Sequence, residues 1–308
     1  MLLTVDNIGF SYGNKSVFEQ VSFSLKPGEI ISIVGPSGAG KSTLLKCLAG
    51  VIDVQNGRIL LENKEVHGPK ENLIPGHPEI ALVNQIFKMD DFFTVRENIA
   101  NQLHHLTLEL REQFTDELLS IFELDDLAYI PSKDISGGEQ QRLTMACALA
   151  KEPKCLLLDE PFVHFDVHLS KKIGEYLRKL AIIRGMGVVL VTHNGVEALS
   201  WSDKILFMKN GKIIRKYTAQ QAYNHPKNLY EGRYFGELNS VYVGDKQILF
   251  RPNHYSLESS VDKVEIDVKW THSLFKGPFY ANYFKLDNGK ELVLYADSEL
   301  ESVQKVYV

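Results

Sequence analysis

Cysteine is scarce in this sequence, and its three occurrences, Cys47, Cys147 and Cys155, each lie in an apolar stretch. Their spacing matches no zinc-binding pattern, so we expect buried thiols of a reducing compartment in place of disulfides or a zinc site. No apolar run approaches the roughly 20 residues needed to cross a bilayer. Residues 1–6 lack the basic start and the apolar stretch of a signal peptide. We therefore expect a cytoplasmic protein that reaches a membrane only through a partner.

Positive charge is also in short supply. Lys and Arg total 34 against 39 Asp and Glu, which leaves a formal net charge of -5. This balance argues against general nucleic-acid binding, which needs a cationic surface to neutralise phosphates. The 308 residues, of which 44% are hydrophobic and 24% charged, are typical of a globular protein and allow two domains with separate cores.

One stretch carries a strong chemical signal. The phosphate-loop pattern G-x-x-x-x-G-K-[ST] is matched without a mismatch by Gly35, Pro36, Ser37, Gly38, Ala39, Gly40, Lys41 and Ser42. An apolar run at 29–34 predicts a buried strand before the loop, and 42–49 predicts a helix after it, with Thr43 at its start. Backbone N–H groups and the helix N-terminus would bind phosphate oxygens. Lys41 would neutralise the β- and γ-phosphates, and the Ser42 hydroxyl would hold Mg²⁺.

The rest of the first 235 residues predicts an α/β fold with a parallel core sheet. Residues 2–25 alternate in polarity, which predicts an antiparallel, half-exposed β-subdomain at the N-terminus. Apolar positions three and four apart over 95–130 predict an inserted helical subdomain at about 90–150. Outside it, apolar strands at 79–83, 155–158 and 187–191 alternate with helices at 140–150 and 169–183.

Beyond about residue 235 the sequence no longer predicts alternating helices and strands, and only short strands are indicated. Short strand candidates occur at 248–250, 264–268, 279–286 and 292–295, and Asp287-Asn288-Gly289 is a strong hairpin signal. The sequence therefore predicts a small, barrel-like all-β domain at 240–308, after a first domain at 1–235.

Polar side chains follow four of the predicted buried strands: Lys41, Gln85, the pair Asp159 and Glu160, and His193. Because ligands bind outside the carboxyl ends of parallel strands, we expect these groups to form one site. Asp159 suits Mg²⁺ coordination, and Glu160 is the best candidate for polarising an attacking water. Gln85 and His193, taken alone, are equally compatible with structural roles, so their assignment to catalysis rests on position.

Ser136, Gly137, Gly138 and Glu139 form a second glycine-containing helix start. The S-x-x-E spacing is that of a capping box, which needs no ligand. Two adjacent glycines, however, remove side chains and allow another surface to approach the N–H groups at this helix start.

With these motifs in order, the sequence resembles the ABC-type ATPases. Residues 135–142 are similar to the signature sequence of that family, and Leu-Leu-Leu-Asp-Glu-Pro at 156–161 is similar to its Walker B motif. The resemblance implies further roles: Gln85 as the Q-loop residue, binding Mg²⁺ with Ser42 and Asp159, His193 as the switch histidine, and Tyr12 as the aromatic that stacks on adenine. It also places Asp166 in the D-loop, at the nucleotide.

The resemblance implies a head-to-tail homodimer, with ATP held between the phosphate loop of one copy and residues 136–139 of the other. Closure on ATP and reopening after hydrolysis would drive transmembrane permease subunits, which would hold the chain at the inner face of the cell membrane.

The C-terminal domain, with Phe250-Arg251-Pro252, resembles the TOBE-type extension of importer ATPases. That likeness implies uptake of a small solute such as ferric iron, a polyamine or an oxyanion, with an extracytoplasmic solute-binding protein as a further partner. Arg251-Pro252 is equally compatible with a plain strand terminus.

Two positions depart from the family pattern. The D-loop is Val163-His164-Phe165-Asp166, with bulkier residues than usual before the acid, and Asn194 follows His193 where aspartate is usual. The alternation of His164, Asp166 and His168 also suggests a metal site, although no further ligand is in view.

Other functions remain open at this point. A soluble ABC-type ATPase acting on nucleic acid or ribosomes usually carries two cassettes, zinc modules or coiled-coil inserts, none of which we find in this sequence. A GTPase-type switch would need an N-K-x-D motif, and residues 63–66 lack its final Asp. An exporter ATPase is a further alternative within the same family.

Overall fold

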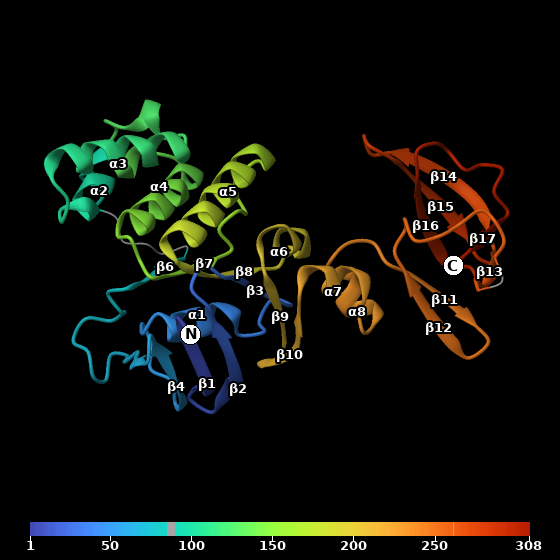
Figure 1. Ribbon diagram of the computed structural model, residues 1–308, viewed down its shortest axis with the longest axis horizontal. Coiled ribbons are helices and arrows are strands. Elements are labelled where there is room, and N and C mark those ends of the chain that lie inside the picture. Colours follow the sequence, from blue (N-terminus) through green and yellow to red (C-terminus); the bar gives the residue numbers. More distant parts are fainter. Residues whose placement is uncertain (85–89, 261) are drawn as a thin grey trace. The chain divides into compact units, whose positions relative to one another are not determined.

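The computed structural model describes residues 1–84, 90–260 and 262–308, in two units, Met1–Ala219 and Gln220–Val308. The central element of the first unit is a six-stranded sheet (Figure 1). Its strand order is β10 (Lys212–Tyr217), β9 (Lys204–Lys209), β3 (Ile30–Val34), β8 (Gly187–Thr192), β7 (Cys155–Asp159) and β6 (Ile80–Val83). All neighbours are parallel except β10, which pairs antiparallel with β9. The four strands predicted to share one parallel sheet, β3, β6, β7 and β8, do so.

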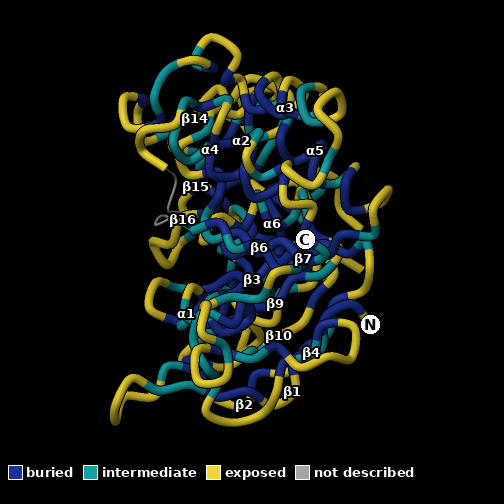
Figure 2. The backbone as a smooth tube through the Cα atoms, turned by 90° about the vertical axis from the view of Figure 1, so that its left-hand side faces the viewer, coloured by how far each residue is buried: buried dark blue, intermediate teal, exposed yellow. Residues whose placement is uncertain are grey.

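Burial on both faces explains the continuous apolar runs of these strands. Side chains alternate along each strand, so Leu156 and Leu158 of β7 lie in one core cluster and Leu157 in another. The first cluster is shared with the helices α2 (Val95–Ala100), α3 (Leu108–Ile121), α4 (Gly137–Ala150) and α5 (Val167–Arg184). The second is shared with α1 (Lys41–Leu48) and the N-terminal strands. Figure 2 shows the central strands as buried between more exposed loops. The central sheet is therefore the middle layer of three.

A second sheet is formed by β2 (Lys15–Leu25), β1 (Leu3–Tyr12), β4 (Asn56–Leu61) and β5 (Lys64–Glu65), in that order. All of its pairs are antiparallel. Along β2, buried Val21, Phe23 and Leu25 alternate with less buried serines, which confirms the predicted half-exposed sheet.

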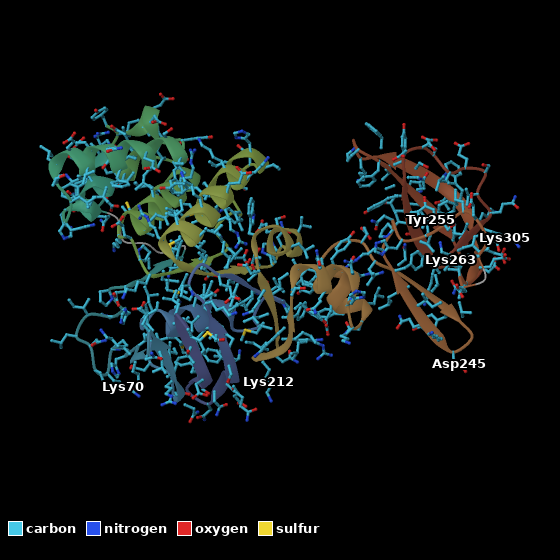
Figure 3. The ribbon with its side chains drawn as sticks, in the orientation of Figure 1. Lys70, Lys212, Asp245, Tyr255, Lys263 and Lys305 are labelled. Atoms are coloured by element: carbon cyan, nitrogen blue, oxygen red, sulfur yellow. The ribbon has the colours of Figure 1, made fainter. Side chains whose placement is uncertain are left out.

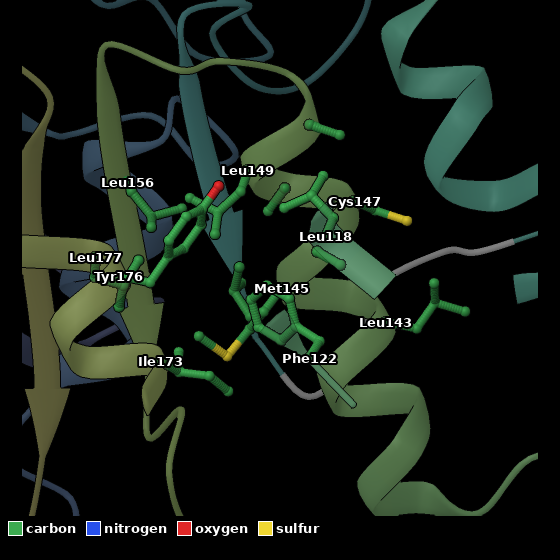
Figure 4. Packing of buried hydrophobic residues seen from close by; sticks show 14 of the residues in the cluster. Leu118, Phe122, Leu143, Met145, Cys147, Leu149, Leu156, Ile173, Tyr176 and Leu177 are labelled. Atoms are coloured by element: carbon green, nitrogen blue, oxygen red, sulfur yellow. The ribbon is translucent and has the colours of Figure 1, made fainter. Parts of the chain in front are cut away.

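The predicted helical insertion is present as several shorter pieces. Its helices are α2 (Val95–Ala100), α3 (Leu108–Ile121) and α4 (Gly137–Ala150), with 3-10 turns at Asn101–Leu103, Asp125–Leu127 and Ser132–Asp134. A capping box at Thr94 starts α2. These helices pack with α5 (Val167–Arg184): Leu118, Phe122, Leu143, Met145 and Ile173 share one cluster (Figure 4).

The second unit contains α7 (Ala219–Asn224), which begins at the boundary, and α8 (Leu229–Arg233). Its strands form three sheets: β11 (Asn239–Val243) with β12 (Lys246–Phe250), β13 (Glu265–Asp267) with β17 (Lys305–Tyr307), and β14 (Lys269–Phe275), β15 (Tyr280–Lys285) and β16 (Glu291–Ala296). Val241, Phe284, Leu294 and Val306 join them in one core. Charged side chains such as Asp245 and Lys305 lie on the outside (Figure 3). The predicted hairpin joins β15 to β16, and Gly289 has a φ of +76° in its turn.

Several elements carried no sequence prediction. They are α6 (Gly195–Trp201), β9 and β10 in the first unit, and β11, β14 and β17 in the second, together with α7 and α8. The run Ile205–Met208 in β9 and the following Asn210-Gly211 turn were available signals of a hairpin. Strand β14 is mostly exposed, so its sequence lacks the alternation of apolar and polar residues that one buried face would produce.

The unit boundary lies earlier than the change in sequence pattern near residue 235, and Arg251 supplies the reason. Its side chain is only 1% exposed. Its guanidinium donates to the carbonyl oxygens of Tyr223, Gly232, Gly236 and Glu237 at 2.8–3.1 Å and lies 4.2 Å from the centre of the Tyr223 ring. Burial lowers the pKa of Arg251. This side chain ties α7 and α8 to the β strands, so it is more than a strand terminus.

We expect Arg251→Met to destabilise the second unit by about 3 kcal/mol, because buried carbonyl oxygens lose their donor. Urea unfolding of the full chain measures this, with Arg233→Met on the exposed side of α8 as the control. A free energy of unfolding that Arg251→Met leaves unchanged would show that these hydrogen bonds do not stabilise the second unit.

Candidate functional site

The phosphate loop between β3 and α1 has the backbone that its glycines predict. At Gly35, φ is +155°, and a side-chain carbon would lie 1.9 Å from the carbonyl oxygen of Met208 in β9. Gly40 has a φ of +97° and precedes the first turn of α1. Ser37 and Gly38 are exposed at the tip, Pro36 and Gly40 are half-buried, and Ala39 is buried. The tip of the loop is therefore open to a ligand.

Lys41 is held inside this loop. Its side chain is 7% exposed, and its ammonium donates to the carbonyl oxygens of Gly35 at 2.8 Å and Pro36 at 3.0 Å. Burial lowers the pKa of Lys41, and the nearby carboxylates of Glu160 and Asp159 oppose that shift. A phosphate would add the anionic partner that this desolvated cation lacks.

The sheet brings Asp159, the last residue of β7, close to the phosphate loop. Ser42 hydrogen-bonds to the Asp159 carboxylate, while burial raises the pKa of Asp159. The Oδ1 atom of Asp159 is buried and has no hydrogen-bond partner in the described chain. An unpartnered carboxylate oxygen beside a hydroxyl fits the hard oxygen ligands that Mg²⁺ prefers. Thr43 is half-buried in the first turn of α1, and Gln85, predicted to complete the metal site, lies outside the described residues.

Glu160 and His193 meet at the ends of β7 and β8. The imidazole Nδ1 of His193 hydrogen-bonds to Oε2 of Glu160. The Glu160 side chain is 27% exposed and that of His193 60% exposed. Glu160 has a left-handed backbone with a φ of +52°, and its N–H donates to the carbonyl oxygen of Val191 at 2.9 Å. The predicted convergence of strand ends is therefore observed for Lys41, Asp159, Glu160 and His193.

The second glycine-containing helix start contains the capping box. The Ser136 hydroxyl accepts from the Glu139 N–H, and the Glu139 carboxylate accepts from the Ser136 N–H at 2.7 Å. A side-chain carbon at Gly137 would meet no other atom of the described chain within 4 Å. At Gly138 it would meet only His164, at an ordinary 3.9 Å. Packing within this chain therefore does not require the two glycines.

Other predicted residues have local roles in this structure. Tyr12 is 55% exposed at the end of β1, where its ring makes an edge contact with Phe10. Asp166 caps α5 by accepting from the Leu169 N–H at 2.8 Å. Asn194 caps α6, so asparagine supplies the oxygen that an aspartate would.

In the described part of the chain, no group of three His, Cys, Asp or Glu could hold a metal ion, including the alternation at 164–168. The three cysteines are buried and free, and burial raises the pKa of Cys147 to about 12.

Sequence reasoning missed a groove beside the site and one polar contact. The groove, of about 710 Å³, is lined by His193, Asn194, Val163, Val167 and Val196, among others. Val163 and Val167 are 50% and 88% exposed. The contact joins Gln141 of α4 to the backbone after β7. Position in the fold determines both, so no local sequence signal could have identified them.

Comparisons with known proteins agree with this geometry. A family model described as ABC transporter matches residues 18–163, which include the phosphate loop, the Ser136 helix start and Glu160. A probable sulfate/thiosulfate import ATP-binding protein of Chlorella vulgaris is 35% identical over 238 residues, 77% of this chain and 99% of that protein. The chain belongs to the ABC transporter family. As an ATP-binding member it is an ATPase.

Further relatives of this ABC ATPase support the assignment. A spermidine/putrescine import ATP-binding protein of Haemophilus ducreyi is 33% identical over 264 residues, 85% of this chain and 69% of that protein. Among solved structures, an ATP-binding cassette described as dimeric, in a post-hydrolysis state and bound to ADP and Pi, superposes with a TM-score of 0.63 at 28% identity. That match covers 70% of this chain and 98% of the cassette. Within the described residues, no helix is long and apolar enough to span a membrane.

Proposed function

We propose that this ABC ATPase is the energy-coupling subunit of an importer for a small solute. Two copies associate head to tail, and each ATP lies between the phosphate loop of one copy and residues 136–139 of the other. Hydrolysis then reopens the dimer and drives separate permease subunits. The observation that supports the dimer is the open space beside Gly137 and Gly138: the described chain does not fill it, so another surface can approach this helix start. The cassette of known structure described as dimeric supports the association of two copies.

The chemistry of the site follows from its own residues. Lys41 and the phosphate-loop N–H groups bind the β- and γ-phosphates, and Tyr12 stacks on adenine. The Ser42 hydroxyl and the Asp159 carboxylate, with Gln85, would hold Mg²⁺, which supplies charge neutralisation at the phosphate oxygens. The Glu160 carboxylate accepts a proton from the water that attacks the γ-phosphorus, and His193 holds that carboxylate in place. Asp166 and the adjoining exposed valines lie at the contact between copies.

The import function rests on the relatives. Those compared above are named for the import of sulfate/thiosulfate and of spermidine/putrescine, so the proposed cargo is an oxyanion or a polyamine. The permease subunits hold the ATPase at the inner face of the membrane, and a solute-binding protein outside delivers the cargo. We propose that the β strands of the second unit, from β11 to β17, form the TOBE-like extension of such importers.

Isolation of the tagged chain from membranes of its own cells tests whether permease subunits associate with it. We expect integral membrane subunits to co-purify in a fixed ratio with the ATPase. Mass spectrometry of the eluate identifies them, and their solute-linked ATPase activity in vesicles would name the cargo. Repeated recovery of ribosomes or DNA without a membrane protein would contradict the importer function.

A further inference from the structure

The side chain of Gln141 joins α4 to the segment that carries the catalytic carboxylate. Its amide Nε2 donates to the carbonyl oxygens of Glu160 at 3.3 Å and Pro161 at 3.1 Å. Its Oε1 atom is buried and has no partner in the described chain. One glutamine, in the second turn of α4, therefore contacts two successive peptide groups next to the active carboxylate.

The backbone that Gln141 contacts is in an uncommon conformation. A left-handed φ, here +52° at Glu160, is disfavoured for residues other than glycine and persists only where the surroundings hold it. The N–H of Glu160 is held by the carbonyl oxygen of Val191, and its carbonyl oxygen by Gln141. The orientation of the Glu160 side chain depends on this backbone. Both hydrogen bonds therefore help to keep its carboxylate directed toward His193.

The same two segments also lie near each other at Gly138. A side-chain carbon at Gly138 would lie 3.9 Å from both the Cβ and the carbonyl oxygen of His164. The first turns of α4 thus lie beside residues 160–164, and the Gln141 side chain bonds the two segments together. A displacement of the start of α4 would therefore be transmitted to the backbone of Glu160.

We propose that Gln141 is a positioning residue that couples the two ATP sites of the dimer. This proposal rests on the proposed function, in which the start of α4 binds the nucleotide of the partner copy while Glu160 acts on the nucleotide of its own copy. Gln141 already joins α4 to the carbonyl groups of residues 160 and 161, so a movement of α4 onto the partner's ATP moves those groups with it. The alignment of the carboxylate in each copy then depends on the nucleotide bound at the other site.

Gln141→Met tests this link, because methionine has a similar volume and lacks the amide donor. Gln102→Met is the control: its Nε2 also donates to a backbone carbonyl oxygen, that of Asn98 at 3.3 Å, and it lies outside residues 135–142 and 159–165. We measure kcat and KM for Mg-ATP hydrolysis by the full chain, and ATP-dependent dimerisation of each variant combined with Glu160→Gln. Gln141→Met is expected to lower kcat roughly tenfold or more, with KM and dimerisation within about twofold of the parent. Gln102→Met should leave all three unchanged.

Backbone hydrogen exchange gives a readout that does not need activity. Amides of residues 159–165 should exchange at least about fivefold faster in Gln141→Met, and at the parental rate in Gln102→Met. An unchanged kcat, or a loss of dimerisation equal to the loss of kcat, would overturn the positioning role. If the parent chain shows no Glu160-dependent hydrolysis, the proposed function fails. Hydrogen exchange is independent of activity. If residues 159–165 exchange at the same rate in Gln141→Met and in the parent, Gln141 does not hold the backbone of residue 160.

Discussion

Replacing Glu160 by glutamine is expected to slow ATP turnover by about 100- to 10,000-fold, the usual contribution of a general base. Glutamine has nearly the same shape, so it keeps the contact with His193 but cannot accept the proton of the attacking water. Binding of ATP should be retained, because Glu160 does not belong to the phosphate loop. The variant should therefore accumulate as an ATP-bound dimer, detectable by size-exclusion chromatography with light scattering.

Glu152→Gln provides the control for this experiment. Glu152 pairs with Arg184 at 2.8 Å, and the two residues precede the starts of β7 and β8, respectively, so they lie away from the carboxyl ends of these strands, where the site is. The same chemical change there should leave both kcat and the oligomeric state unaltered. A Glu160→Gln protein that hydrolyses ATP at the parental rate would remove Glu160 from the mechanism.

Lys41→Ala is expected to have the largest effect on binding, weakening the affinity for ATP by about 10- to 100-fold. The reason is that hydrogen bonds to charged groups contribute about 1.5–3 kcal/mol. The ammonium already points into the loop through its bonds to Gly35 and Pro36, so little order is lost when phosphate binds. Titration calorimetry measures the affinity directly. The rise in melting temperature that ATP gives the parent chain should shrink accordingly.

Lys70→Ala removes the same charge from an exposed loop position and serves as the control (Figure 3). Its affinity for ATP should equal that of the parent, because surface charge alone has a weak, screened effect. Equal affinities for Lys41→Ala and Lys70→Ala would show that the phosphate loop does not bind the triphosphate through Lys41. A melting curve without nucleotide separates lost binding from lost folding.

Local sequence patterns by themselves determined the parts of this protein whose structure depends on near neighbours. The phosphate loop needs glycine at 35 and 40 because of their positive φ values, and the capping box at Ser136 joins residues three apart. Apolar runs identified the strands β3, β7 and β8 because both faces of a central parallel sheet are buried. The convergence of Lys41, Asp159 and Glu160 followed from the rule that ligand sites lie at the carboxyl ends of such strands.

Only the tertiary structure decided the contacts between segments far apart in the chain. The order β3, β8, β7, β6 determines which strand ends adjoin, and it brings His193 to Glu160. The bonds of Gln141 to the backbone after β7, and of Arg251 to four carbonyl oxygens in and after α7 and α8, leave no periodic trace in the sequence. Each depends on where packing places a backbone group with an unfilled hydrogen-bonding position, and that placement is a property of the whole fold.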